Sequence, residues 1–311
     1  MKKILVIKLG ALGDFIISLG AIMKLRERFP EAEFSLMTHK SLIPIAKQTG
    51  MFSSFIEDNR VSYMKLREQT RVFREVMAGA FDAVIDFQAN PRTEKKYYSV
   101  MRWFMSRPYC WINTIKRVKR NIHKTRAFSW GKCSEEEFIT EWPKTDLSFL
   151  HGENKYFHEL PERFVLMIPG CSPTHPYKRW PVENFCAVAQ KLAERGIHSV
   201  VLGTKAESAE VDAIVASTPM AVSMLNKTSL LDIPDLVQRS LAAVGNDTGP
   251  SHIAAYSGRP NIAIFDQRTA ASVTNGPQSI NLVSPSTIDL ITVDMVWEKL
   301  LPIIEVAEAK S

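Results

Sequence analysis

The sequence predicts an α/β protein with two open, doubly wound domains of parallel strands. Its 311 residues exceed the usual size of a single hydrophobic core, so two domains of comparable length are expected. Short apolar runs of strand length alternate with segments whose apolar residues have helical spacing, a pattern typical of a parallel sheet covered by helices. Loops with glycine or proline follow several of these runs, as in folds that bind ligands at strand ends.

The first predicted domain begins with an apolar strand at residues 3–8, followed by a glycine turn. The next segment has the apolar spacing of a helix with one buried face. Further buried strands are predicted at 34–38 and 83–87. The residues that give the helical spacing are Ile16, Leu19, Ile22 and Met23.

A polar, acidic stretch from Ser134 to Pro161 separates the two halves and contains proline and glycine. Such a composition is typical of a linker. The sequence therefore predicts domains at residues 1–158 and 159–311.

The second predicted domain repeats the alternation of strand and helix. A terminal segment with apolar residues at helical spacing, including Val296 and Leu300, is expected to pack on a domain face. The predicted strands are 164–168, 199–202, 242–245 and 261–265, and the predicted helices are 182–195, 230–240 and a short one after Gly249.

Composition excludes several classes of protein. With 45% hydrophobic and 23% charged residues, a globular protein is expected rather than a disordered one. No apolar run approaches the roughly 20 residues that cross a bilayer, and the first segment is interpreted as a strand rather than a signal peptide. The four cysteines lack a Cys-x-x-Cys or zinc spacing, so we expect reduced thiols in the cytoplasm.

The net charge of +6 and the pI near 9.1 favour an anionic partner. Between Arg92 and Arg126, eleven cations accompany a single acid, Glu94, and aromatic residues are interleaved with them. Three interpretations stay open: a solvated basic surface, a contact with anionic lipid, or a nucleic-acid surface. The last of these lacks a recognised binding module, so no nucleic-acid partner is expected.

The first candidate motif is a Gly-x-x-Gly turn after the first strand, which brings Asp14 to a helix start. Ligands sit outside the carboxyl ends of strands in open α/β sheets, so Asp14 is expected to face the crevice between the domains. The alternative is a structural role, because an aspartate there also caps free backbone donors. The glycine spacing does not match the Gly-x-Gly-x-x-Gly fingerprint of dinucleotide-binding domains.

The second motif is the loop 169–181, which also follows a strand end and leads into a helix. Ser172 and Thr174 have small hydroxyl side chains and Lys178 is a cation, a combination that can bind phosphate oxygens. A simple turn with a solvated lysine is the alternative.

The third motif is the segment 245–252, Gly-Asn-Asp-Thr-Gly-Pro-Ser-His. Here a strand ends at Asp247, glycine permits close backbone approach, and the following helix directs free amides towards the crevice. Such a site can bind a diphosphate. His252 lies one turn inside the helix and could equally be a packing residue.

In this order, the three motifs resemble those of glycosyltransferase family 9, the lipopolysaccharide heptosyltransferases. The resemblance covers residues 1–30 and 163–266. It implies two Rossmann-like domains facing a central cleft, the GT-B type, with acceptor on the N-terminal domain, donor on the C-terminal domain and inversion at the anomeric carbon. It also implies that the last helix crosses back to the N-terminal domain.

The resemblance further implies roles for individual residues. Asp14 matches the general base, and Lys178 the lysine that binds the donor phosphates. The donor-binding residues that it implies or that the loops suggest are Ser172, Thr174, Glu207, Thr228, Asp247, Thr248, Gly249 and His252, with Thr228 beside the nucleobase and Glu207 near the ribose. The expected acceptor-binding residues are Gly13 of the first motif and, from the charge of the basic region outside the resemblance, Arg92, Lys95, Lys96 and Arg120.

The expected reaction is metal-independent transfer of heptose, or a related sugar, from an ADP donor to the inner core of lipopolysaccharide or a similar lipid-linked glycan. The chain has no Asp-x-Asp pair to bind a metal on the diphosphate, so no metal is expected to be required. The sugar nucleotide is a substrate, and no cofactor is expected. The basic region would dock the acceptor or the inner membrane leaflet, which predicts a cytoplasmic protein at the periphery of that membrane.

Two rival functions stay open, and two loops depart from the family pattern. One rival is a nicotinamide-dependent oxidoreductase, and the other is a non-catalytic homologue that binds anionic lipid. Residues 265–269, Phe-Asp-Gln-Arg-Thr, stand where the family commonly has a Gly-Pro-Thr loop, which is expected to affect which sugar is held. Residues 171–173, Cys-Ser-Pro, replace a more usual small and hydroxyl run near the phosphates.

Overall fold

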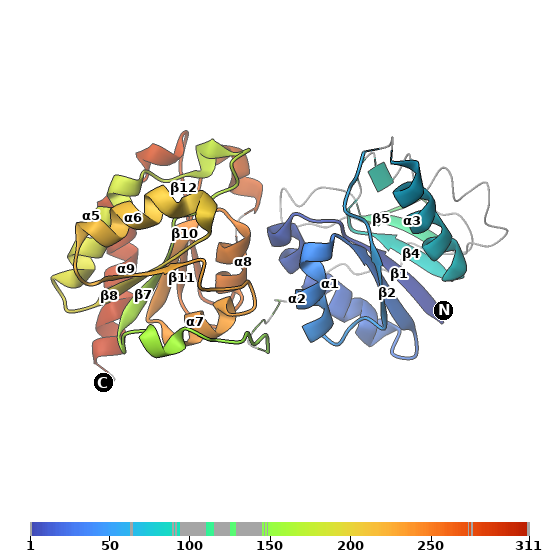
Figure 1. The fold of residues 1–311 in the computed structure, drawn as a ribbon, viewed down its shortest axis with the longest axis horizontal. Helices are drawn as coiled ribbons and strands as arrows, with labels where there is room; N and C mark the ends of the chain where they lie inside the picture. The colour runs from blue at the N-terminus through green and yellow to red at the C-terminus, as the bar shows by residue number, and fades with distance from the viewer. Residues whose placement is uncertain are drawn as a thin grey trace. The chain divides into compact units, whose positions relative to one another are not determined.

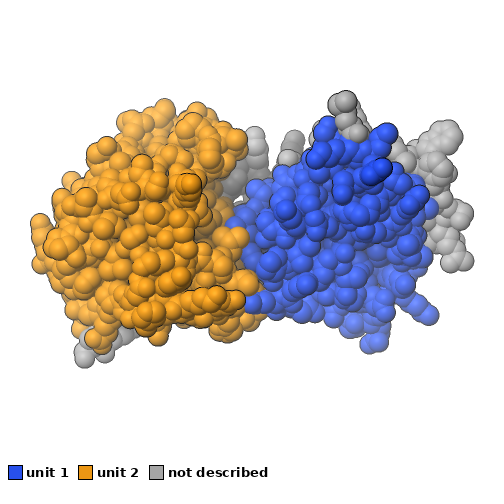
Figure 2. All heavy atoms as spheres, in the orientation of Figure 1, with its two compact units in different colours: residues 1–143 blue, residues 144–311 orange. Residues whose placement is uncertain are grey.

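The chain forms two compact units, residues 1–143 and 144–311 (Figure 2). The computed structural model describes residues 2–62, 65–88, 90, 92–93, 110–114, 125–128, 145, 147, 149–272, 274 and 276–309, with the backbone alone at 110–114, 125–128 and 271–272. The second unit begins before the predicted boundary at 158 because the preceding segment is bonded to it. Leu147 N donates to Tyr256 O at 2.9 Å, and Asn154 N donates to Asp232 Oδ1 at 2.9 Å.

The first unit contains a sheet with the strand order β3-β2-β1-β4-β5-β6. The pairs from β3 to β5 are parallel, and β6 runs antiparallel to β5. The strands predicted near residues 3–8, 34–38 and 83–87 are confirmed. The bounds are β1 Lys3–Ile7, β2 Glu33–Thr38, β3 Ser54–Glu57, β4 Ala83–Asp86, β5 Cys110–Thr114 and β6 Thr125–Phe128.

The helices of the first unit are amphipathic. In α1, Ile16, Leu19 and Ile22 are buried and Met23 is partly buried, as the apolar spacing predicts. Val72 and Val76 of α3 pack in a core with Leu5 and Ile7 of β1. The helices are α1 Leu12–Arg28, α2 Ile43–Gln48 and α3 Leu66–Ala78, with a 3-10 turn at Lys40–Leu42.

The second unit has a wholly parallel sheet with the order β12-β11-β10-β7-β8-β9 (Figure 1). Numbered within the unit, this is the doubly wound order 3-2-1-4-5-6, so the strand order reverses between β7 and β10. The central strands are buried on both faces, which explains their continuous apolar sequences. The strands are β7 Phe164–Ile168, β8 His198–Gly203, β9 Ala221–Leu225, β10 Ala242–Asn246, β11 Asn261–Phe265 and β12 Ser279–Val283.

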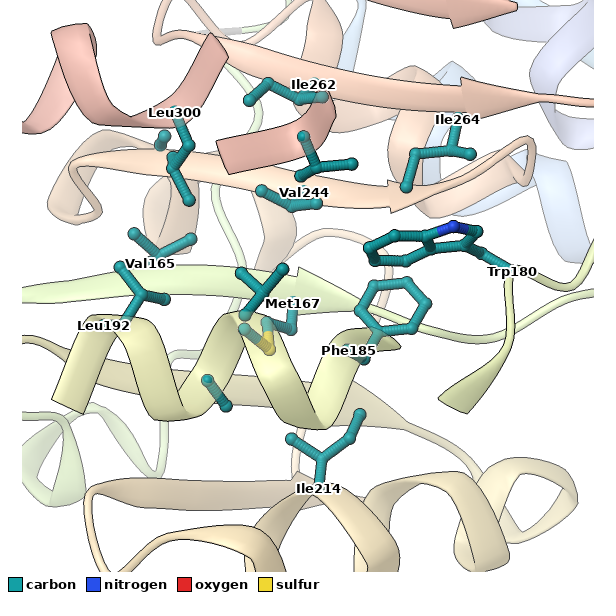
Figure 3. Close-up of a cluster of buried hydrophobic side chains, with 14 of the residues drawn as sticks. Val165, Met167, Trp180, Phe185, Leu192, Ile214, Val244, Ile262, Ile264 and Leu300 are labelled. Atoms are coloured by element: carbon teal, nitrogen blue, oxygen red, sulfur yellow. The ribbon is translucent and has the colours of Figure 1, made fainter. Parts of the chain in front are cut away.

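Helices cover the second sheet and enclose its main core. Trp180 lies against Phe185 at a centroid distance of 4.9 Å, with the two rings edge to face (Figure 3). The Trp180 indole N–H is satisfied because it donates to Ile291 O at 2.7 Å. The α-helices are α5 Val182–Ala193, α6 Ser208–Ser217, α7 Ile233–Arg239, α8 Gly249–Ala255 and α9 Val293–Glu308. The 3-10 helices are η5 Phe157–Glu159, η6 Pro176–Lys178, η7 Lys205–Glu207, η8 Gln267–Ser272 and η9 Ile288–Leu290.

The terminal helix α9 belongs to the core of the second unit. Val296, Leu300 and Ile304 are fully buried there, and α9 packs against α5, β10 and β11. Its end is joined to the same unit by Glu308, which binds Arg163 and Arg195. The buried face of α9 covers β10 and β11, and the expected contact of this helix with the N-terminal domain stays a prediction. Within the described part of the chain, no helix is long and apolar enough to span a membrane.

Candidate functional site

The switch point of the second sheet brings two of the predicted motifs together. Because β7 and β10 are neighbours, the loops that follow them meet at the carboxyl edge of the sheet. Lys178 ends the 3-10 helix η6 in the loop after β7, and Asp247 follows β10 directly. The Lys178 Nζ lies 2.7 Å from Asp247 Oδ2. The sequence prediction that both residues belong to one site therefore agrees with their placement.

Asp247 is the buried centre of a charged cluster. Its side chain is 3% exposed, against 20% for Lys178, and its Oδ1 lies 3.3 Å from His252 Nε2. Burial alone would raise the pKa of Asp247, but hydrogen bonds from His252 and Lys178, together with their charges, outweigh it and hold the pKa below its usual range. The carboxylate is thus ionised at neutral pH and holds the Lys178 ammonium at the strand end.

The loop that positions Lys178 is braced by hydrogen bonds. Asn246 accepts from Trp180 N at 3.1 Å and donates to Pro169 O at 2.7 Å, which joins the end of β10 to both ends of the loop. Arg179 pairs with Glu210 of α6. The Cys171 thiol lies 3.1 Å from His175 O, and burial raises its pKa, so it is a packing group in this loop.

The start of α8 lies close to β10 because residue 245 is glycine. A Cβ there would stand 2.7 Å from both Ile168 Cβ and Ser251 Oγ. Ser251 Oγ and His252 Nδ1 are buried and have no hydrogen-bond partner among the described residues. Two polar atoms at this point are therefore able to bind a further group. Thr248 and Gly249, also predicted as donor-binding, begin the helix and are half-buried.

The remaining predicted donor residues lie on the β8 side of Lys178. Glu207 ends η7 after β8, where its Oε2 accepts from Thr204 N at 2.9 Å and Thr204 Oγ1 at 2.6 Å. The Glu207 side chain packs on Gly170, whose missing Cβ would meet Glu207 Cγ at 3.0 Å. Thr228 follows β9 and is half-buried.

Two hydroxyl residues of the loop after β7 bind each other. Ser172 Oγ lies 2.8 Å from Thr174 Oγ1, and Thr174 Oγ1 lies 2.8 Å from His175 Nδ1. Both are exposed, so their contact with phosphate stays a prediction.

Sequence reasoning missed a cation on the β11 side of Lys178. Arg268, in the loop after β11, binds the fully buried Asp266 through Nε at 2.7 Å and Nη2 at 2.9 Å. Its guanidinium stacks over Tyr177, 4.0 Å from the ring centroid. The departure of residues 265–269 from the family pattern was the available signal, but it gave no indication that Arg268 would reach the Lys178 loop.

In the first unit, Asp14 lies in the first turn of α1 at the corresponding switch point, after β1. Its Oδ2 is 3.8 Å from Nζ of Lys8, a buried lysine that donates to Phe87 O at 3.2 Å. Gln88 Oε1 accepts from Leu9 N at 3.0 Å, which joins the turn after β1 to the end of β4. Asp14 keeps 40% of its side chain exposed, so it can meet a substrate. Gly13 is buried in α1.

The predicted acceptor-binding residue Arg92 has a structural partner. It binds Asp58 with Nη2 at 2.7 Å and Nε at 3.1 Å, and its Nη1 donates to Val61 O at 3.1 Å. Lys95, Lys96 and Arg120 lie outside the described residues. Among those described, no group of three or more His, Cys, Asp or Glu residues is placed to hold a metal ion.

Comparisons with known proteins agree with these motifs. The model of Glycosyltransferase family 9 (heptosyltransferase) matches residues 69–284. The lipopolysaccharide core heptosyltransferase OpsX of Haemophilus influenzae is 22% identical over 284 residues, which cover 85% of this chain and 79% of OpsX.

Solved structures share the fold. The E. coli heptosyltransferase WaaC with ADP superposes with a TM-score of 0.70 at 16% identity, covering 97% of this chain and 99% of WaaC. A family 9 glycosyl transferase from Veillonella parvula has a TM-score of 0.76 at 18% identity and 97% coverage of both chains. The predicted GT-B class, with two Rossmann-like domains, is thereby confirmed.

Proposed function

Since the chain belongs to glycosyltransferase family 9, the heptosyltransferases, we propose that it transfers heptose with inversion from ADP-heptose to the inner core of lipopolysaccharide. The observation that supports this most directly is the Lys178, Asp247 and His252 cluster at the switch point of the second sheet. WaaC, which has the same fold, was solved with ADP and with ADP-2-deoxy-2-fluoro heptose. These ligands make an ADP-sugar the first donor to test.

In the proposed donor complex, the diphosphate binds beside Lys178. The Lys178 ammonium has three N–H donors, so a pair with Asp247 leaves donors for phosphate oxygens. Ser251 Oγ and His252 Nδ1 supply further polar atoms next to it. As the bond between the anomeric carbon and the phosphate oxygen breaks, negative charge grows on the departing ADP, and Lys178 stabilises that charge.

In the proposed reaction, Asp14 is the general base. Its carboxylate takes the proton of the acceptor hydroxyl while the hydroxyl oxygen attacks the anomeric carbon, so one C–O bond forms as the other breaks. Lys8 supports this role because its buried ammonium, fixed by Phe87 O, is paired with Asp14 and orients the carboxylate. Attack on the face opposite the departing ADP gives inversion.

We propose that the reaction needs no metal ion, because Lys178 provides the charge that a metal would otherwise supply to the diphosphate. The absence of an Asp-x-Asp pair from the sequence supports this. We further propose that the protein works in the cytoplasm at the inner membrane, where the basic segment 92–126 would meet the phosphorylated, lipid-linked acceptor.

The test combines calorimetry with a transfer assay, both in EDTA. Wild-type protein is expected to bind ADP in preference to UDP, GDP and NAD, and to transfer heptose from ADP-heptose to lipopolysaccharide lacking its heptose. Lys178→Ala is expected to weaken ADP binding about tenfold to a hundredfold, because a charged hydrogen bond is lost. Asp14→Asn is expected to lower turnover by about 10² to 10⁴ while leaving the ADP affinity unchanged.

These two variants control for each other, since one should affect the nucleotide and the other the acceptor. Preference for UDP or GDP would show that the donor sugar is carried by that nucleotide and not by ADP. Binding of NAD alone would support the oxidoreductase alternative. Normal turnover in Asp14→Asn would remove Asp14 from the base role. Activity that EDTA abolishes and added divalent metal restores would contradict the metal-independent mechanism.

A further inference from the structure

The loops at the carboxyl edge of the second sheet follow one another in a fixed order. Glu207 follows β8, Lys178 follows β7, Asp247 follows β10 and Arg268 follows β11, and these strands are adjacent in the sheet. In doubly wound nucleotide-binding domains, an acidic residue after the second strand binds the ribose hydroxyls. Glu207 has this position in the second unit.

This order assigns a direction to the bound donor. With the diphosphate beside Lys178 and the ribose on the β8 side, the transferred sugar must extend to the other side of the phosphates, towards β10 and β11. That side ends in the loop with Arg268. This direction rests on the proposed function, in which the bound molecule is a nucleotide sugar.

Arg268 is held in place before any ligand binds. Fully buried Asp266 accepts from the Arg268 backbone N–H at 2.9 Å as well as from the guanidinium. The loop is fixed further by Gln267 N, which donates to Ser286 O at 3.3 Å, and by Thr269 N, which donates to Asp266 O at 2.9 Å. The guanidinium is therefore anchored at one edge.

The Arg268 guanidinium also contacts Tyr177, because its Cζ lies over the ring, 4.0 Å from the centroid. Tyr177 precedes Lys178 in η6, and His175 packs edge-on against the Tyr177 ring at 5.7 Å. The stack thus joins the loop after β11 to the loop that bears the phosphate-binding lysine. It places the N–H donors of the guanidinium next to the site, and the side chain loses little conformational entropy when a ligand binds.

We infer that Arg268 binds the hydroxyl groups of the transferred sugar, and that the Arg268, Asp266 and Tyr177 cluster determines which sugar the donor site accepts. The Arg268 side chain is 57% exposed, and its Nη1 has no hydrogen-bond partner among the described residues. Asp266 already balances the positive charge of the guanidinium. The remaining N–H groups of the Arg268 guanidinium therefore suit neutral hydroxyls better than a carboxylate or a further phosphate.

The experiment compares ADP with ADP-heptose in wild type, Arg268→Ala and Arg268→Lys. Arg268→Ala is expected to leave the dissociation constant of ADP within about twofold and to weaken ADP-heptose binding about tenfold, seen as a raised KM. Arg268→Lys keeps a cation beside Asp266 but loses the planar fork, so only partial recovery is expected. Arg259→Ala, an exposed arginine of the same unit away from these loops, serves as the matched control and should behave as wild type.

Specificity supplies a second readout, and Tyr177→Leu supplies a second variant that removes the aromatic ring under Arg268. The preference of the enzyme for ADP-heptose over ADP-mannose, whose sugar has six carbons, should fall about tenfold in Arg268→Ala, and by a smaller factor in Tyr177→Leu because Arg268 stays bonded to Asp266. An unchanged KM and preference in Arg268→Ala would overturn the inference. An equal loss for ADP and ADP-heptose would also overturn it, since Arg268 would then act on the phosphates through the Lys178 loop. If wild type itself bound ADP but not ADP-heptose, the proposed function would fail with it.

Discussion

Arg92 shows how a residue can be assigned one role from the sequence and another from its contacts. The run of basic residues after Arg92 suggested an acceptor surface. In the fold, the Arg92 guanidinium binds Asp58 with two hydrogen bonds, and Asp58 also accepts from Arg60 N at 2.8 Å. Arg92 lies 34 residues from Asp58, and no local sequence pattern marks Asp58 as buried. Only the tertiary fold could identify this pair.

The exposures of this pair give a stability prediction. The side chains of Asp58 and Arg92 are 1% and 13% exposed, so Arg92→Ala would remove the guanidinium that pairs with a buried carboxylate. We expect this change to lower the free energy of unfolding by about 3 kcal/mol, measured by urea denaturation. Arg67→Ala, at an exposed position on α3, should cost no more than about 0.5 kcal/mol. Equal, small losses in both variants would mean that the pair adds nothing to the fold.

At the scale of elements, the sequence predicted central strands better than edge strands. The bounds of β7 and β11 agree with the predicted runs at 164–168 and 261–265, because strands buried on both faces are continuously apolar. The edge strand β12 was missed, since its Ser-Ile-Asn-Leu-Val sequence is only partly buried and resembles a loop. The edge strand β9 was also missed, and it too is only partly buried.

The terminal helix α9 offers a prediction at this scale. Its spacing indicated a buried face correctly, but the element that this face covers could not be derived from periodicity alone. Leu300 is fully buried among the residues of the main core (Figure 3), so Leu300→Ala should destabilise the second unit by about 2–5 kcal/mol.

Val306 on the same helix provides the control for Leu300. It is 56% exposed, so Val306→Ala should change the stability by about 0.5 kcal/mol or less. Thermal unfolding monitored by circular dichroism would separate the two variants. Similar melting temperatures would show that α9 is not part of the cooperative core.

For the whole molecule, a site residue could be predicted when it follows the end of a single strand, because that strand alone determines its position. Asp14, Lys178 and Asp247 each follow an apolar strand, so the parallel topology alone brings them to a carboxyl edge. Arg268 was not predictable in this way. Its contact with Tyr177 depends on two loops that follow different strands, β11 and β7, and on the intervening β10.

The charge of the whole chain is distributed unevenly along the sequence. Residues 92–126 contain eleven of the 39 cations and one of the 33 acids, so the remaining residues have 28 cations, 32 acids and a net charge of −4. The net positive charge of the protein therefore comes from this one segment. A protein with this distribution should approach an anionic membrane through that segment.

This distribution predicts selective binding to anionic vesicles. Each lysine or arginine near such a surface contributes about 1 kcal/mol, so replacing Lys95, Lys96 and Arg120 with glutamine should weaken binding roughly a hundredfold. Sedimentation with vesicles of phosphatidylglycerol and phosphatidylcholine would measure it, and binding should fall as salt is raised because exposed charges are screened. The control replaces Lys24, Lys155 and Lys205 with glutamine, which removes the same charge from exposed positions elsewhere. If the two triple variants bound equally well, net charge rather than the basic segment would govern the interaction, and tighter binding of wild type to RNA than to vesicles would favour a nucleic-acid partner.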